Sequence, residues 1–279
     1  MKIKNIAKSL SGVGGTLAVF VPSNAGLVIA ADRRQTPKGI FCDGLEKILR
    51  PDQPARTAVV VTGLITLRDM PDLTGSALCD HLANTPAPID FGRTTLAFLT
   101  AENTPVAQFD GQKFTDAVFG DVGPYLAAGK LSGLAGSRIA QILIASYDPV
   151  ARTSSILAYG VDLTADRRFL VQPLPVTAST TLQGPSFNLD SERILLPFGE
   201  VPYLRQHVLS GHGQMYLTGA YSEFLSKTRV RDVEPSLAAA AALEVIEATA
   251  KTTEIIPAPS GIGGGSSALL LGEETVTLK

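Results

Sequence analysis

Residues 14–34 of this 279-residue chain read GGTLAVFVPSNAGLVIAADRR. Two short apolar runs, 16–21 and 26–31, lie on either side of Pro22-Ser23-Asn24-Ala25, whose residue types are typical of turns. The pattern predicts a β-hairpin. Both runs are apolar at successive positions instead of alternate ones, which indicates strands covered on both faces. We therefore expect the hairpin to lie in a sheet inside a layered domain.

The rest of the chain shows strands and helices without the regular alternation of βαβ units. Further strands are predicted at 40–42, 45–50, 57–63, 139–146, 154–160 and 168–172, with a closing strand after the glycine-rich turn at 261–267. A long amphipathic helix is predicted at 236–251, and weaker helices at 74–84, in parts of 90–100 and 112–128, and at 221–227. This order predicts an α+β layered domain in which helices cover the sheets on both sides.

Residues 173–213 differ from the rest in having no firm hydrophobic period. The segment is rich in Pro, Ser, Gly and Thr, a composition typical of turns and loops. We expect it to be an insertion or an extended surface excursion within one domain.

Composition and charge exclude several classes of protein. Apolar residues make up 45% of the chain, which excludes disorder, and a net charge of −2 leaves no positive surplus for nucleic acid. No apolar stretch approaches the roughly 18 residues of a spanning helix, so no membrane partner is expected. Cys42 and Cys79 form no CxxC motif. They are interpreted as reduced thiols, which fits a cytoplasmic location.

The N-terminus also permits a different interpretation. Three lysines precede a weakly apolar stretch that ends in Ser23-Asn24-Ala25, which can be read as a signal-peptide cleavage site. Glycines and Pro22 interrupt that stretch. On this alternative the chain is a secreted β-rich binding protein that begins at Gly26.

Four residues whose groups can take part in catalysis stand at the ends of predicted strands or within them. Thr16 opens the first strand, Asp32 closes the second, Lys47 lies within 45–50, and Gly63 ends an apolar strand. Together, and in this order, they resemble the β-type subunits of the proteasome and related bacterial ring peptidases such as HslV. The resemblance is best over 14–65.

The resemblance implies a fold, a maturation step and partners. The fold would be the four-layer αββα sandwich of N-terminal nucleophile hydrolases. Residues 1–15 would be a propeptide, removed by self-cleavage between Gly15 and Thr16, and 16–279 a single domain. The resemblance also implies a peptide or unfolded-protein substrate, a homo-oligomeric double ring and a hexameric ATPase as a further partner. It implies no cofactor and no metal.

The implied roles agree with elementary chemistry. A threonine hydroxyl is a weak nucleophile, and the α-amino group freed on Thr16, with an ordinary pKa of about 7.7–8.0, is a base beside it. Lys47 would lower the pKa of neighbouring groups, and Asp32 would hold its ammonium in place. Gly63 lets its backbone N–H approach the scissile carbonyl and stabilise the oxyanion.

The period of the strands adds an expectation about specificity. Leu45 and Leu49 share a strand face with Lys47, and Val61 and Ile65 share one with Gly63. In the family that the chain resembles, positions matching these four apolar residues line the pocket for the side chain that precedes the cut. An apolar substrate preference is therefore implied.

Two positions depart from the family pattern. Where the family has Ser after Gly, the segment Leu217-Thr218-Gly219-Ala220 has Ala220, and at the end of the long helix Thr252 stands where the family has Asp. Replacements could come from Thr218, Ser222, Thr253, Glu254 or Ser260. A proteasome-like scaffold without peptidase activity thus remains the alternative function.

Overall fold

The predicted hairpin lies in the middle of a five-stranded antiparallel sheet. The fold is taken from a computed structural model that describes residues 16–278 apart from 38–39, 64–65, 68–71, 88, 119–134, 167, 177–184, 218 and 258–260. The hairpin strands are β1 (Leu17–Ser23) and β2 (Gly26–Asp32). Strand β11 (Leu196–Gly199) pairs with β1, while β12 (Ser266–Gly272) joins β2 to β13 (Thr275–Leu278).

The second antiparallel sheet is built on three long strands, β4 (Thr57–Gly63), β7 (Ser137–Asp148) and β8 (Thr153–Leu163). Its strand order is β10-β8-β7-β4-β3, and β9 also pairs with β8. The shorter strands are β3 (Ile48–Leu49), β9 (Phe169–Leu174) and β10 (Ser186–Phe187), and a separate pair is formed by β5 (Thr66–Leu67) and β6 (Ile89–Asp90).

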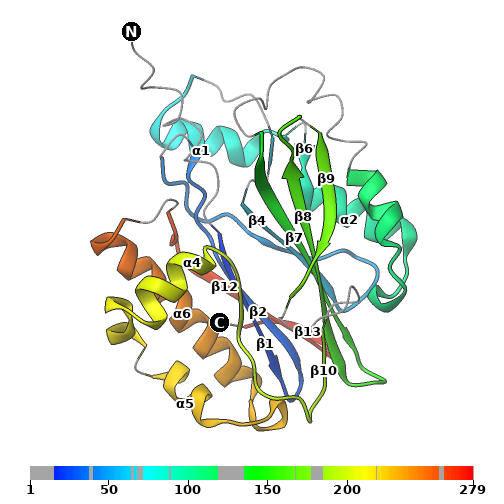
Figure 1. The fold of residues 1–279 in the computed structure, drawn as a ribbon, viewed down its shortest axis with the longest axis vertical. Coiled ribbons are helices and arrows are strands. Elements are labelled where there is room, and N and C mark those ends of the chain that lie inside the picture. The colour runs from blue at the N-terminus through cyan, green and yellow to red at the C-terminus, as the bar shows by residue number, and fades with distance from the viewer. Residues whose placement is uncertain are drawn as a thin grey trace.

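Helices cover the outer face of each sheet. Helix α6 (Pro235–Ile255) packs on the first sheet, with α5 (Ala220–Ser226) against it. Helix α2 (Phe91–Glu102) and the helical residues 111–118 cover the second sheet. A third apolar cluster fills the space between the two sheets. The result is a four-layer αββα sandwich (Figure 1), which confirms the predicted fold class.

Strand β1 shows why its sequence is apolar without alternation. Leu17 and Val19 point into the cluster under α6, whereas Ala18 and Phe20 point into the cluster between the sheets. Every residue of β1 is buried, and so is every residue of β2. The prediction of strands covered on both faces is confirmed.

This central position bears on the alternative in which the chain is cleaved after Ala25. Cleavage after Ala25 would remove β1, which pairs with both β2 and β11 and contributes to two of the core clusters. The alternative of a secreted protein beginning at Gly26 is therefore inconsistent with the fold. Among the described residues, no helix is both long and apolar enough to cross a membrane.

Residues 173–213 contain more structure than a surface excursion. Where the segment is described, it supplies β11, whose Leu196 and Phe198 pack between the sheets. It also forms α4 (Val201–Tyr203), a π-helical turn over Leu204–Leu209 and a 3-10 helix over His212–Tyr216. Tyr203 is buried beside α6. Apolar residues at Leu196 and Phe198, two positions apart, were the overlooked signal of a buried strand.

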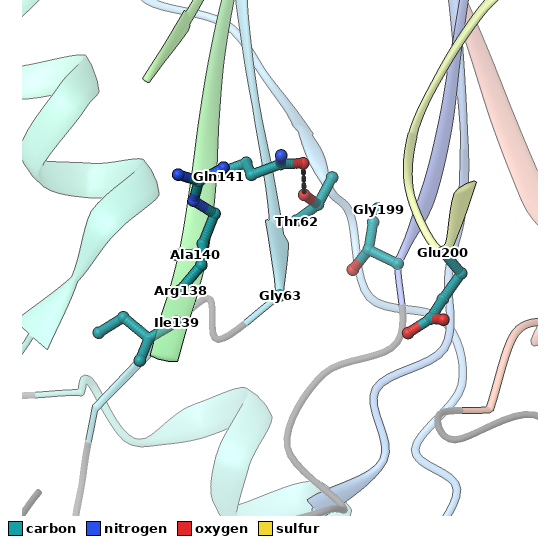
Figure 2. A pocket seen from close by; sticks show the side chains of 9 residues that line it. Thr62, Gly63, Arg138, Ile139, Ala140, Gln141, Gly199 and Glu200 are labelled. Carbon is teal, nitrogen blue, oxygen red and sulfur yellow. Dashed lines mark hydrogen bonds between the residues drawn. The ribbon is translucent and has the colours of Figure 1, made fainter. Parts of the chain in front are cut away.

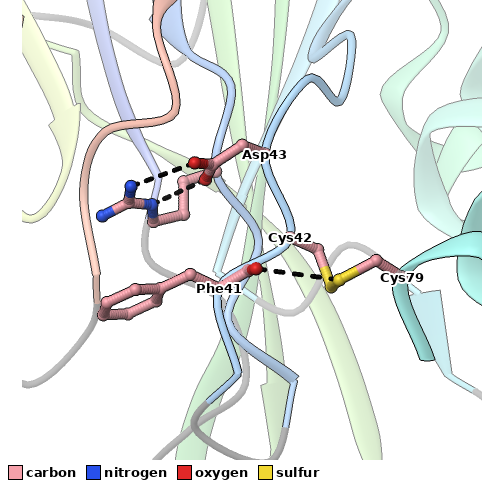
Figure 3. The surroundings of a disulfide bond; sticks show 5 residues. Phe41, Cys42, Asp43 and Cys79 are labelled. Atoms are coloured by element: carbon pink, nitrogen blue, oxygen red, sulfur yellow. Dashed lines mark hydrogen bonds and ion pairs between the residues drawn. A yellow bond between two sulfur atoms is a disulfide. The ribbon is translucent and has the colours of Figure 1, made fainter. Parts of the chain in front are cut away.

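The interpretation of the two cysteines as reduced thiols is wrong. Cys42 and Cys79 form a disulfide across a sequence separation of 37 residues. It joins the segment after β2 to α1 (Gly75–Asn84), and Leu78 and Leu82 of that helix pack beside it in a small separate cluster. Figure 3 shows the bond next to Asp43, which forms an ion pair with Arg34 at 2.7 Å. The location in the cytoplasm remains a prediction.

Two predicted strands before β4 are shorter than expected. Residues 40–42 contribute only an isolated bridge between Gln35 and Cys42, and 45–50 contribute only β3. Pro51, which has no N–H to donate, follows this short edge strand. The helix predicted at 112–128 is present at 111–118, and its remainder lies outside the described residues.

Candidate active site

Asp32, at the end of β2, is completely buried, with 0% of its surface exposed. Its Oδ1 accepts hydrogen bonds from the Leu17 N–H at 2.9 Å and from Lys47 Nζ at 3.0 Å. Its Oδ2 accepts from the N–H groups of Arg34 and Gly263, at 3.2 and 3.5 Å. Burial raises the pKa of Asp32, and Lys47 and the backbone donors oppose that rise. Four donors thus compensate the burial of one carboxylate.

Lys47 is the charged partner of Asp32 and is only 3% exposed. Its ammonium also donates to the carbonyl of Arg34. Burial lowers the pKa of Lys47, and the attraction of Asp32 opposes this. Because one Asp32 oxygen accepts from both Lys47 and the Leu17 N–H, the ammonium lies two hydrogen bonds from the peptide unit that joins Thr16 to Leu17.

Thr16 immediately precedes β1 and is 1% exposed. Its Oγ1 is buried and has no hydrogen-bond partner in the part of the chain that the structure describes. Since Ala18 and Phe20 point between the sheets, the strand period places the Thr16 side chain on that same face. A buried hydroxyl without a partner is costly, and such exceptions in folded proteins call for an explanation such as catalysis.

A cavity of about 200 Å³ lies beside Thr16. Its walls come from β4 and β7 on one side and from β11 on the other, as Figure 2 shows with Gln141 and Glu200 on opposite sides. Its lining includes Thr16, Thr62, Gly63, Arg138, Gln141 and Glu200. The fold therefore brings two of the predicted catalytic residues, Thr16 and Gly63, to one cavity.

Gly63 is at the cavity end of β4, in a conformation that suits glycine. Its φ is +81°, and a Cβ at this position would lie 2.7 Å from the Ile139 carbonyl oxygen. A side chain would therefore collide with the neighbouring strand. The glycine leaves the backbone of Gly63 open to the cavity, where an N–H could meet a substrate carbonyl.

The polar side chains of the cavity were not among the residues predicted from the sequence. Thr62 and Gln141 are opposite each other in β4 and β7 and share a hydrogen bond of 3.2 Å. Arg138 makes a bidentate ion pair with Asp162, at 2.8 and 3.1 Å. The polar Thr62 at the end of an apolar run was a usable signal. Glu200 had none, because it follows a short strand in a segment without a period.

Gly199 sets how closely β11 approaches Thr16. It has a φ of +92°, and a Cβ there would lie 1.8 Å from the Thr16 carbonyl oxygen. We expect Gly199→Ala to push β11 away from β1 and to lower the free energy of unfolding by more than backbone strain alone, which costs about 1–3 kcal/mol. Urea unfolding measures the loss.

Gly136→Ala is the matched control for that substitution. Gly136 has a φ of +82°, but a Cβ there would meet nothing within 4 Å. The control therefore reports the cost of the conformation without the collision. Equal losses of stability in the two variants would contradict the close approach of β11 to Thr16.

The four residues expected to line an apolar pocket lie in different surroundings. Val61 is buried in the cluster beneath α2, and Leu49 packs against that cluster. Leu45 is partly buried, and Ile65 lies outside the described residues. The lining described for the Thr16 cavity mixes polar residues with Ile139, Ala140 and glycines, and it includes none of these four residues. A role for these four residues in binding substrate remains a prediction.

Ala220 and Thr252, the two departures from the family pattern, lie in the helical layer on the first sheet. Ala220 begins α5, where the N–H groups of Gly219 and Tyr221 donate to Glu244 of α6 at 2.8 and 2.7 Å. The Thr252 hydroxyl donates to the Ala248 carbonyl at 2.6 Å, one turn back in α6. Both positions thus serve packing and hydrogen bonding around α6.

Comparison with known proteins gives a likeness in fold. No family model and no curated protein matches the chain. A Gly-1 mutant of Anbu from Hyphomicrobium sp. strain MC1 is 10% identical with a TM-score of 0.41, covering 95% of this chain and 85% of that one. Anbu (ancestral beta-subunit) from Yersinia bercovieri is 11% identical with a TM-score of 0.44, covering 94% and 87%.

These findings correct the resemblance drawn from the sequence. The assignment to the proteasome β-type subunits and HslV-like peptidases is wrong, because no family model supports it and the similar structures are Anbu proteins of very low identity. Four residues over some 50 positions were too few to identify a family. The fold itself is an α+β sandwich of two antiparallel sheets between helices, and Thr16 immediately precedes its first strand.

Proposed function

We propose that this chain is an N-terminal threonine hydrolase that cuts peptide bonds, with Thr16 as its nucleophile. The observation that carries the proposal is the Thr16 hydroxyl, which is buried without a partner among the described residues and lines a cavity. The Asp32–Lys47 ion pair lies directly beside its peptide unit. A nucleophile, a nearby positive charge and room for a substrate are the parts that such chemistry needs.

The first step on this proposal is self-cleavage before Thr16. The Thr16 hydroxyl adds to the Gly15 carbonyl, the Gly15–Thr16 C–N bond breaks, and the acyl group passes from nitrogen to oxygen as an ester. Water then hydrolyses the ester, giving a Gly15 carboxylate and a free α-amino group on Thr16. Residues 1–15 would leave as a propeptide.

Turnover of a substrate would repeat the same chemistry in trans. The α-amino group of Thr16 accepts the hydroxyl proton as Oγ1 attacks the substrate carbonyl, then returns a proton to the leaving amine. The Gly63 N–H would stabilise the oxyanion. Lys47, held by Asp32, would favour the deprotonated forms of its neighbours through its charge. Water releases the acyl group from Thr16.

A second candidate function is a subunit with this fold that performs no hydrolysis. It is favoured by Ala220, which has no polar side chain, and by Thr252, whose hydroxyl is bonded to the Ala248 carbonyl within α6. On either candidate, a homo-oligomeric double ring and a hexameric ATPase partner remain predictions. Light scattering of the native chain measures the assembly, and a monodisperse monomer would contradict the ring.

The N-terminal residue of the purified chain distinguishes the two candidates. Intact mass and N-terminal sequencing should identify Thr16 as the first residue if self-cleavage occurs. They should identify Met1 as the first residue if the chain performs no hydrolysis. Hydrolysis of fluorogenic peptides by the same preparation then tests turnover. A chain that keeps Met1 and cuts no peptide, even when produced with Thr16 as its first residue, would exclude the hydrolase.

A further inference from the structure

Glu200 lies opposite Thr16 in the first sheet. The pairing of β1 with β11 ends at Leu17 and Gly199, and one further step of the antiparallel register places Glu200 across from Thr16. The Glu200 N–H donates to the Thr16 carbonyl at 3.3 Å, which agrees with that step. Glu200 itself lies just beyond β11, with φ −75° and ψ 44°, where the chain turns into α4. Both residues also line the same cavity.

The direction of the backbone brings the Thr16 nitrogen to the same edge. Successive N–H groups of a strand point to opposite sides, and the Leu17 N–H points to Asp32 on the β2 side. The nitrogen of Thr16 therefore points to the β11 side, toward Glu200. The Asp32–Lys47 pair and Glu200 thus flank Thr16 from its two neighbouring strands.

We propose that Glu200 is a positioning residue whose carboxylate holds the α-ammonium group of processed Thr16. This inference rests on the proposed function, because the amino group exists only after cleavage at Gly15–Thr16. A carboxylate within about 4–6 Å favours the charged form of an amine. Glu200 therefore stabilises the ammonium that forms when Oγ1 gives up its proton.

Other charged groups surround Thr16 and contribute to the pKa of its amine. They are Asp32 and Lys47 on the β2 side, Arg33 next to Asp32, and Arg138 across the cavity, which Asp162 holds. All of these are unchanged when Glu200 alone is altered. The difference between native and variant therefore measures the contribution of Glu200.

The test uses a chain produced with Thr16 as its first residue. NMR titration of ¹³C-labelled threonine, assigned with a Thr16→Ser variant, measures the pKa of the α-amine in native protein and in Glu200→Gln. We expect the substitution to lower that pKa by about one unit. The acid limb of the kcat/KM profile should move to lower pH by the same amount, with a lower maximum rate.

Two further variants keep the test decisive. Glu274→Gln removes an exposed carboxylate at the β12–β13 turn, the far end of the same sheet, and should leave the amine pKa unchanged. Glu200→Asp keeps the charge and should keep most of the rise in the amine pKa that Glu200 causes. It also replaces Glu200→Gln in the test if that variant does not fold. The proposal would be overturned if the amine pKa were equal in native protein and Glu200→Gln. It would also be overturned if Glu200→Asp lowered that pKa by the full amount expected from removal of the charge. Absence of hydrolysis with an intact pKa shift would instead count against the proposed function.

Discussion

Thr16→Ala is expected to leave the chain uncleaved and to lower peptide hydrolysis by at least about 10³-fold, because it removes the atom that attacks the carbonyl. The fold should remain, since the Thr16 hydroxyl makes no hydrogen bond within the described residues. Intact mass measures processing, and fluorogenic peptides measure turnover. Thr16→Ser keeps a hydroxyl and should keep both reactions at a reduced rate.

Thr36→Ala is the matched control for Thr16→Ala. Thr36 is also a buried threonine whose Oγ1 has no partner among the described residues, but it lies outside the lining of the Thr16 cavity. The control therefore removes a comparable hydroxyl without touching the proposed nucleophile. Processing and turnover that survive Thr16→Ala, or that fall equally in Thr36→Ala, would refute the role of Thr16.

Lys47→Met is expected to destabilise the protein by about 3–5 kcal/mol and to remove activity even when Thr16 is already exposed. The substitution leaves the Asp32 carboxylate buried without its ion-pair partner. Methionine retains most of the side-chain volume, so the loss reports charge more than packing. Chemical denaturation measures the stability, and peptide hydrolysis by the folded fraction measures the activity.

Two comparisons separate folding from chemistry for Lys47. Lys113→Met breaks an exposed ion pair with Glu102 and should cost no more than about 1 kcal/mol. Lys47→Met combined with Asp32→Asn removes both charges, so it should recover part of the stability while remaining inactive. Full turnover in either Lys47 variant would exclude an electrostatic role for this lysine.

Much of the site could be predicted because its parts are local in sequence. Turn chemistry and apolar runs predicted the hairpin that follows Thr16 and ends at Asp32. The grouping of these two residues with Lys47, which immediately precedes β3, came from the resemblance. The Asp32–Lys47 ion pair follows from the strong cost of burying either charge alone. The helix at α6 was equally clear from its period and its initial proline.

Glu200 and the disulfide could not be predicted, since each depends on a contact distant in sequence. Glu200 meets Thr16 through β11, a four-residue strand whose register is set by the fold and not by any local pattern. Cys42 meets Cys79 only because α1 packs on the segment after β2. The prediction that Leu49 and Val61 line a substrate pocket relied on the strand period. That period shows which residues share a face of the strand, but it does not show which layer of the fold covers that face.

Because of the Cys42–Cys79 bond, preparations of this protein can differ in the oxidation state of the two cysteines. The segment that ends at Lys47 is attached to α1 through this bond and the small cluster of Leu78 and Leu82. Where the bond is reduced, the covalent attachment is lost and only the apolar contacts remain. Assays of processing and turnover should therefore be run on oxidised and reduced samples side by side, with the thiol content of each determined.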